Sequence, residues 1–163
     1  MVESTLDVLV YLLKNYFQEN CELPTTTDEL LITLLQAGFD HDTAQTALSW
    51  LRKLTSLTSE IYLYGKAHSR SMRIFSLYEC EHLDESARAF LLQMLERKLL
   101  TSTECELVIE QALCLDERMR LTEGHIKIVS MLVLFHSTEP HAKGALAQIE
   151  KEILVKEGVT GVH

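Results

Sequence analysis

The chain has 163 residues, of which 47% are hydrophobic and 24% are charged. This composition is typical of a folded globular protein and excludes an intrinsically disordered chain. The 24 Asp and Glu residues outnumber the 15 Lys and Arg residues and give a net charge of −9, which argues against a surface built to bind nucleic-acid phosphates.

The first predicted elements are three helices separated by short loops. A first helix is expected near residues 4–17, where leucines recur at helical spacing. A second helix is expected over residues 28–37, because Gly38 is suited to ending it. A third helix then begins at Asp40, whose side chain can cap its first turn. Residues 28–54 therefore have the length of a helix-turn-helix unit, with suitable residues to end its first helix and to begin its second.

The pattern changes after the third helix. Residues 61–64 and 72–75 are short runs rich in β-branched and aromatic side chains, and a polar loop separates them. Such a pair of runs predicts a small β-hairpin over residues 61–75. With the helix-turn-helix unit, this hairpin would make residues 1–76 resemble a winged helix.

The same region has a positive net charge, whereas the parts of the chain before and after it are negative. Residues 1–58 hold eight acidic and three basic side chains, and residues 77–163 hold fifteen acidic and nine basic ones. Residues 59–76 hold one acidic side chain and three basic ones, Lys66, Arg70 and Arg73. The basic character of this acidic protein is therefore concentrated in the middle of the sequence.

From Ser76 onward, every predicted element is a helix. Ser76 and Thr101 are each followed three residues later by Glu, the pattern of a capping box. Acidic residues at such helix starts, Glu104 among them, are explained by the helix dipole without any catalytic role. The segment 126–135 is apolar on nearly all sides, so we expect a central helix with Leu132 and Phe135 buried.

These elements predict a mainly α fold with two packed helical halves. The N-terminal half, residues 1–76, is expected to be helix-turn-helix-like or winged-helix-like and to carry the small β-hairpin. The C-terminal half, residues 77–163, is expected to be a helical bundle.

No residue pattern in the sequence indicates an enzyme, a metal site or a cofactor. Glycine-rich phosphate-binding motifs are absent. Cys80 and His82 form an isolated Cys-x-His pair, whereas structural zinc sites show paired ligands and nucleophilic cysteines need a base and a third orienting group. His136 and His141, on either side of Pro140, are expected to be exposed in a loop. We therefore expect no catalytic residue, no cofactor and no metal.

A cytoplasmic location without membrane association is expected. Residues 1–17 lack the basic start and the cleavage site of a signal peptide. The apolar segment 126–135 is about half as long as a bilayer-spanning helix. The four cysteines, at positions 21, 80, 105 and 114, form no CxxC pair, which is typical of reduced thiols.

Seven blocks of sequence, among them Ala37-Gly38-Phe39-Asp40 and Ser71-Met72-Arg73-Ile74-Phe75, follow one another along the chain. They are residues 6–12, 37–40, 47–54, 71–75, 79–84, 109–116 and 131–135. In these blocks the chain resembles the proteobacterial Smg protein family over nearly its whole length. The resemblance implies a small, acidic, cytoplasmic protein, generally encoded near DNA topoisomerase I. It implies no established activity, cofactor or catalytic residue.

Two functions remain open from the sequence. The first is a non-enzymatic adaptor or regulator that binds an unknown protein partner. The residues expected to form the partner surface gather in the central segment, where aromatic and Arg side chains of the kind that anchor interfaces occur together. They are Tyr62, Tyr64, Lys66, Arg70 and Arg73.

The second function is association with nucleic acid through the winged-helix-like half, using the same basic residues. The net charge of the chain argues against it. Asp40 and Asp42 also lie at the start of the helix that would enter the groove, where they would repel phosphates.

Overall fold

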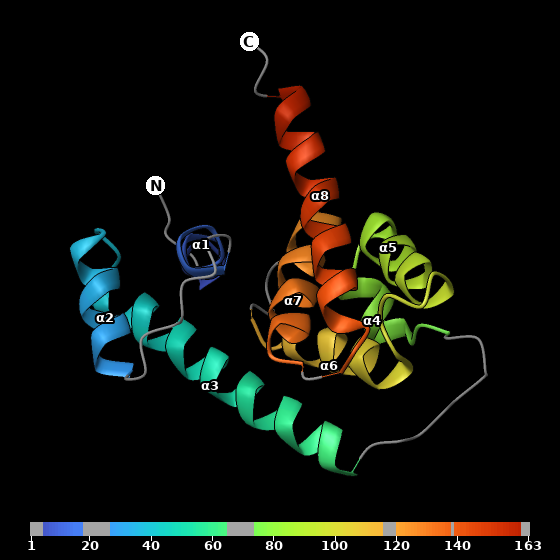
Figure 1. Ribbon diagram of the computed structural model, residues 1–163, viewed down its shortest axis with the longest axis horizontal. Helices are drawn as coiled ribbons and strands as arrows, with labels where there is room; N and C mark the ends of the chain where they lie inside the picture. The colour runs from blue at the N-terminus through green and yellow to red at the C-terminus, as the bar shows by residue number, and fades with distance from the viewer. Residues whose placement is uncertain (1–4, 18–26, 65–73, 116–119, 138, 161–163) are drawn as a thin grey trace. The chain divides into compact units, whose positions relative to one another are not determined.

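A computed structural model describes residues 5–17, 27–64, 74–115, 120–137 and 139–160 of the chain. All regular elements in these ranges are helical, and no β-strand occurs among them, which confirms the mainly α prediction (Figure 1). The elements are α1 (Thr5–Leu12), the π-helical turn η1 (Leu13–Phe17), α2 (Thr27–Gln36), α3 (His41–Tyr64), α4 (Leu77–His82), α5 (Glu85–Glu96), α6 (Ser102–Leu113), α7 (Glu123–Phe135) and α8 (Ala142–Thr160).

The chain divides into two compact units, Met1–Leu57 and Thr58–His163. The continuous helix α3 contributes to both units, because the division falls inside it. The sequence instead predicted a boundary between residues 76 and 77. That boundary stays a prediction, since residues 65–73 lie outside the described part of the chain.

The first unit is built from α1, η1, α2 and the first part of α3. Its core consists of buried aliphatic side chains, among them Leu9, Leu12, Leu34 and Leu54. The turn between α2 and α3 is tight because Gly38 adopts a φ of 102°, a conformation that side chains disfavour. Backbone hydrogen bonds from Gly38 and Phe39 then satisfy the last carbonyl groups of α2.

The predicted β-hairpin over residues 61–75 is wrong. Residues 61–64 form the last turn of α3, and residues 74 and 75 precede α4 without strand structure, so the described residues hold no wing. Extending an existing helix adds one hydrogen bond for each residue fixed, and no Gly or Pro interrupts α3 before Gly65. The helix therefore continues through a segment whose side chains also favour strands.

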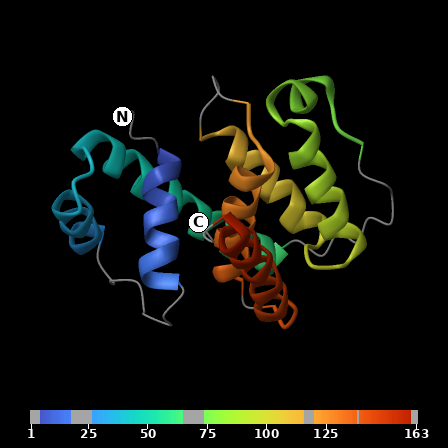
Figure 2. The ribbon, with the colours of Figure 1, turned by 90° about the horizontal axis from the view of Figure 1, so that it is seen from above.

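The second unit is a bundle centred on α7, which packs against α5, α6 and α8 (Figures 1 and 2). Leu132 is fully buried in this core, as expected from the apolar pattern of the helix. Phe135 was also expected to be buried, but 36% of it is exposed. It is the last residue of α7.

The predicted capping boxes of the second unit are confirmed. Ser76 Oγ accepts a hydrogen bond from the Glu79 backbone, and the Glu79 carboxylate accepts one from the Ser76 backbone. Thr101 and Glu104 make the same reciprocal pair at the start of α6. These local contacts could be predicted because both partners lie within one turn of the chain.

Candidate functional site

The five residues predicted to form a partner surface do not form a described site. Tyr62 and Tyr64 lie in the last turn of α3. The helix takes the place of the strand in which these two residues were expected. Lys66, Arg70 and Arg73 lie outside the described residues.

The start of α3, where a recognition helix would contact DNA, is acidic and exposed. His41, Asp42, Gln45 and Thr46 are all exposed there. The carboxylate of Asp40 accepts a hydrogen bond of 3.2 Å from the Asp42 backbone and so caps the helix. Two carboxylates at this end of the helix would repel phosphate groups.

The strongest candidate for a binding surface is α4 together with the residues that precede it. Ile74 is 81% exposed, Leu77 is 79% exposed and Tyr78 is 51% exposed. None of the six residues of α4 is fully buried. Isolated apolar side chains are ordinary on protein surfaces, but three large ones within five residues form a cluster that is typical of interaction sites.

Hydrogen bonds hold both ends of α4 although the helix buries none of its residues. The capping box of Ser76 and Glu79 fixes its start. At its end, the Leu121 backbone donates to the His82 carbonyl at 2.7 Å, and the Asp84 backbone donates to the Leu121 carbonyl at 2.9 Å. The short helix is therefore anchored by its backbone while its apolar side chains remain exposed.

Asp84 lies directly after α4 and caps α5. Burial alone would raise the pKa of its carboxyl group. Hydrogen bonds from Ser86 and Ala87 and the positive charge of Arg120 outweigh this cost, and the pKa is lowered from its usual value. Asp84 therefore carries a negative charge at neutral pH.

The side chains of Cys80 and His82 contact neighbouring residues of α4 and α5. Arg88 Nη1 donates to Cys80 Sγ at 3.3 Å. The His82 ring lies 4.2 Å from the Tyr78 ring, and its Nδ1 atom contacts the Tyr78 carbonyl at 2.8 Å. Among the described residues, no group of three or more His, Cys, Asp or Glu side chains is placed to hold a metal ion.

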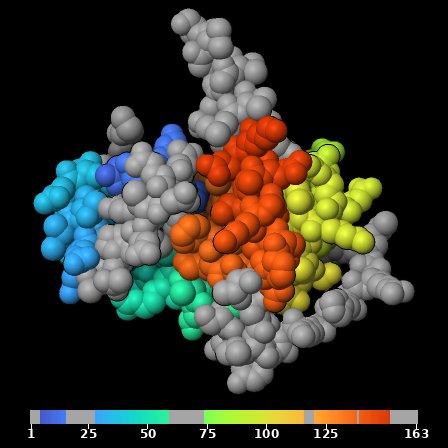
Figure 3. All heavy atoms as spheres, viewed as in Figure 1, coloured from blue at the N-terminus to red at the C-terminus, as the bar shows by residue number. Residues whose placement is uncertain are grey.

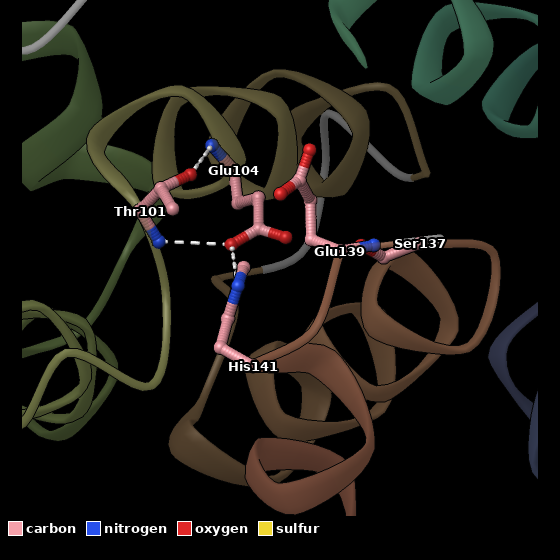
Figure 4. A network of polar contacts seen from close by, with 5 residues as sticks. All are labelled: Thr101, Glu104, Ser137, Glu139 and His141. Carbon is pink, nitrogen blue, oxygen red and sulfur yellow. Dashed lines mark hydrogen bonds and ion pairs between the residues drawn. The ribbon is translucent and has the colours of Figure 1, made fainter.

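A buried polar network joins the start of α6 to the start of α8 (Figure 4). Glu104 Oε1 lies 2.7 Å from His141 Nε2 and accepts a 2.9 Å hydrogen bond from the Thr101 backbone. The Glu104 side chain is only 1% exposed. Figure 3 shows the first turns of α8, in orange-red, beside the yellow region that contains α6. His141, expected in the sequence to be exposed in a loop, is half-buried in this contact.

Comparison with known proteins identifies the relatives of the chain. Residues 5–163 match the family described as "Protein of unknown function (DUF494)". The chain belongs to this family. Among its curated relatives is the "Protein Smg homolog" of Coxiella burnetii (strain Dugway 5J108-111), 38% identical over 161 residues that cover 99% of the chain and 98% of the relative. The Xanthomonas oryzae pv. oryzae (strain PXO99A) homolog is 34% identical over 158 residues, covering 96% of the chain and 97% of the relative.

The match to curated relatives named "Protein Smg homolog" over nearly the whole chain confirms the resemblance to Smg proteins. The family description and the names of these relatives state no activity, so the function must be inferred from the molecule itself. No solved structure matches the chain. In the described part of the chain, no helix is sufficiently long and apolar to span a membrane.

Proposed function

We propose that this member of the DUF494 family is a cytoplasmic, non-enzymatic adaptor or regulator that acts through protein–protein contacts. One observation carries the proposal: Ile74, Leu77 and Tyr78 expose large apolar surfaces on a short segment whose backbone is anchored. Leaving such side chains in water is unfavourable, and covering them with a partner removes that cost.

The partner surface that we propose also includes the segment that precedes α4. In the sequence, Tyr62, Tyr64, Lys66, Arg70 and Arg73 lie directly before the exposed apolar residues. Tyr and Arg are over-represented among the residues that dominate binding energy at interfaces. Their proximity in sequence to Ile74 supports one continuous binding region.

Photocrosslinking in the native cell tests this function. A benzophenone amino acid at position 77 keeps the position apolar and reports which protein lies over α4. We expect a protein adduct from position 77 and none from position 93 on α5, where Gln93 is also exposed. Substituting Ile74→Ser and Tyr78→Ser in the crosslinking protein should reduce the adduct at least tenfold, because both apolar contacts are lost.

The controls distinguish a lost contact from a lost fold. Because Ile74 and Tyr78 are exposed, their substitution should leave the melting temperature of the protein nearly unchanged. The absence of any adduct at position 77, or an identical set of adducts at positions 77 and 93, would refute the proposed binding surface.

Nucleic-acid association is the alternative function, and it rests on Lys66, Arg70 and Arg73 in the sequence. It predicts DNA binding that weakens steeply with salt and disappears in an Arg70→Glu, Arg73→Glu variant. We favour the protein partner because the exposed start of α3 carries Asp42 and the chain has a net charge of −9. A gel-shift titration at low salt, with micromolar protein and duplex or single-stranded DNA, discriminates between the two.

A further inference from the structure

Helix α8 has fewer main packing partners than α5, α6 and α7. These three helices pack against one another in all three pairs, so each of them is held by two neighbours within the group. The main neighbour of α8 is α7. Separation of α8 from the bundle would therefore leave three helices that still pack pairwise.

The part of α8 that is buried against the bundle is small. Among its described side chains, those of residues 142–151, only Ala142, Ala145 and Ile149 are buried. Because alanine buries little apolar area, these three side chains stabilise the closed helix less than three leucines would. Helix α8 is also longer than α7, 19 residues against 13, and its last turns extend beyond α7 (Figure 1).

A polar contact ties the start of α8 to a second helix, α6 (Figure 4). His141 Nε2 lies 2.7 Å from Glu104 Oε1, and the Glu104 side chain is only 1% exposed. Separation of α8 breaks this hydrogen bond, but it also admits water to a buried carboxylate, which recovers part of the cost of burying the charge. Loss of the contact is therefore less costly when α8 opens than when Glu104 stays buried without its partner.

We propose that α8 is a detachable cover, which separates from the bundle as one piece while α5, α6 and α7 stay folded, and that the Glu104–His141 contact holds it closed. Helix α7 buries eight of its 13 residues. Opening of α8 therefore presents apolar surface of α7 that the closed protein hides. This inference goes beyond the proposed function and does not depend on a partner at α4.

Native-state hydrogen exchange of the purified full chain, followed by NMR in urea below the unfolding midpoint, tests the separate opening of α8. Amides of residues 146–151, beyond the first turn of α8, should exchange faster than those of α7. Their exchange should also depend less on urea, because opening one helix exposes less surface than complete unfolding. Equal rates and equal urea dependence in the two helices would overturn the proposal.

A substitution in α5 separates the opening of α8 from unfolding of the whole bundle. Leu91→Val shortens a fully buried side chain of α5, a helix that stays packed when α8 opens. It should accelerate the exchange of α7 severalfold and leave residues 146–151 unchanged. An equal acceleration of α7 and α8 would show that they open together and would overturn the proposal.

A substitution of His141 tests the contact that holds α8 closed. His141→Ala should accelerate exchange at residues 146–151 by about tenfold, because the closed state then buries Glu104 without this partner. His41→Ala, at an exposed histidine of the first unit, should leave the same amides unchanged. If His141→Ala also leaves them unchanged, the Glu104–His141 contact does not hold α8 closed.

Discussion

Glu104 carries a carboxylate that is almost completely removed from water, a position that is costly for a charge without hydrogen-bond donors. The Thr101 backbone and the His141 ring supply donors to the same carboxylate oxygen. His141 lies 37 residues away in the sequence, so the contact ties the start of α8 to the start of α6. This contact makes His141 a structural residue of the second unit.

Replacing His141 by Ala should lower the free energy of unfolding by about 1–3 kcal/mol, because the buried Glu104 side chain loses one of its hydrogen-bond partners. Urea unfolding followed by circular dichroism measures the change. His41→Ala, at an exposed histidine in the first unit, is the matched control and should have little effect. If the two variants are equally stable, the Glu104–His141 contact does not stabilise the fold.

At the scale of the helix, one histidine lies at each end of α7: His125 in its first turn and His136 directly after its last residue. The pKa of each is lowered, so the neutral form of each ring is favoured. Burial lowers the pKa of His136, and its hydrogen bond to the Leu132 carbonyl, which favours the charged form, offsets this only in part. Burial also lowers the pKa of His125, against the opposing attraction of Asp84. The Nδ1 atom of His125 accepts a hydrogen bond from the Thr122 backbone, and protonation of that atom would remove the acceptor.

A histidine with a lowered pKa takes up a proton more readily in the unfolded chain than in the folded one. Its contribution to stability is therefore complete above a pH of about 6.5 and is lost as the pH falls through the folded-state pKa. We expect the urea midpoint of the wild type to decrease between pH 7.5 and pH 5.5. His136→Gln should decrease less over the same interval, and an unchanged pH dependence would contradict the role of His136.

At the scale of the whole molecule, two apolar residues of α7 that look equivalent in the sequence, Leu132 and Phe135, differ in how deeply the core of the second unit buries them. Leu132, in the last turn of α7, is fully buried, whereas Phe135, the last residue of the helix, is partly exposed. Leu132→Ala should cost about 2–5 kcal/mol of unfolding free energy, because it removes a buried side chain and leaves a cavity. Phe135→Ala should cost clearly less, and thermal melts of both variants at one pH test the order.

The helices and their caps could be predicted from the sequence because their signals are local, as at Ser76 and Thr101. The predicted hairpin was wrong because a four-residue run with strand propensity does not reveal that the preceding helix continues into it. The exposure of α4 could not be predicted at all. Ile74 and Leu77 have the sequence character of core residues, and only the folded chain shows that they remain in contact with solvent.

The continuity of α3 across the two units has a consequence for limited proteolysis. In the sequence, the first unit ends at Leu57 and the second begins at Thr58. The peptide bond between these residues lies inside a hydrogen-bonded helix rather than in a loop. Proteases require locally unfolded chain, so the junction should resist cleavage until part of α3 unwinds. The rate of cutting at this junction would therefore report the opening of α3 and not an ordinary linker between domains.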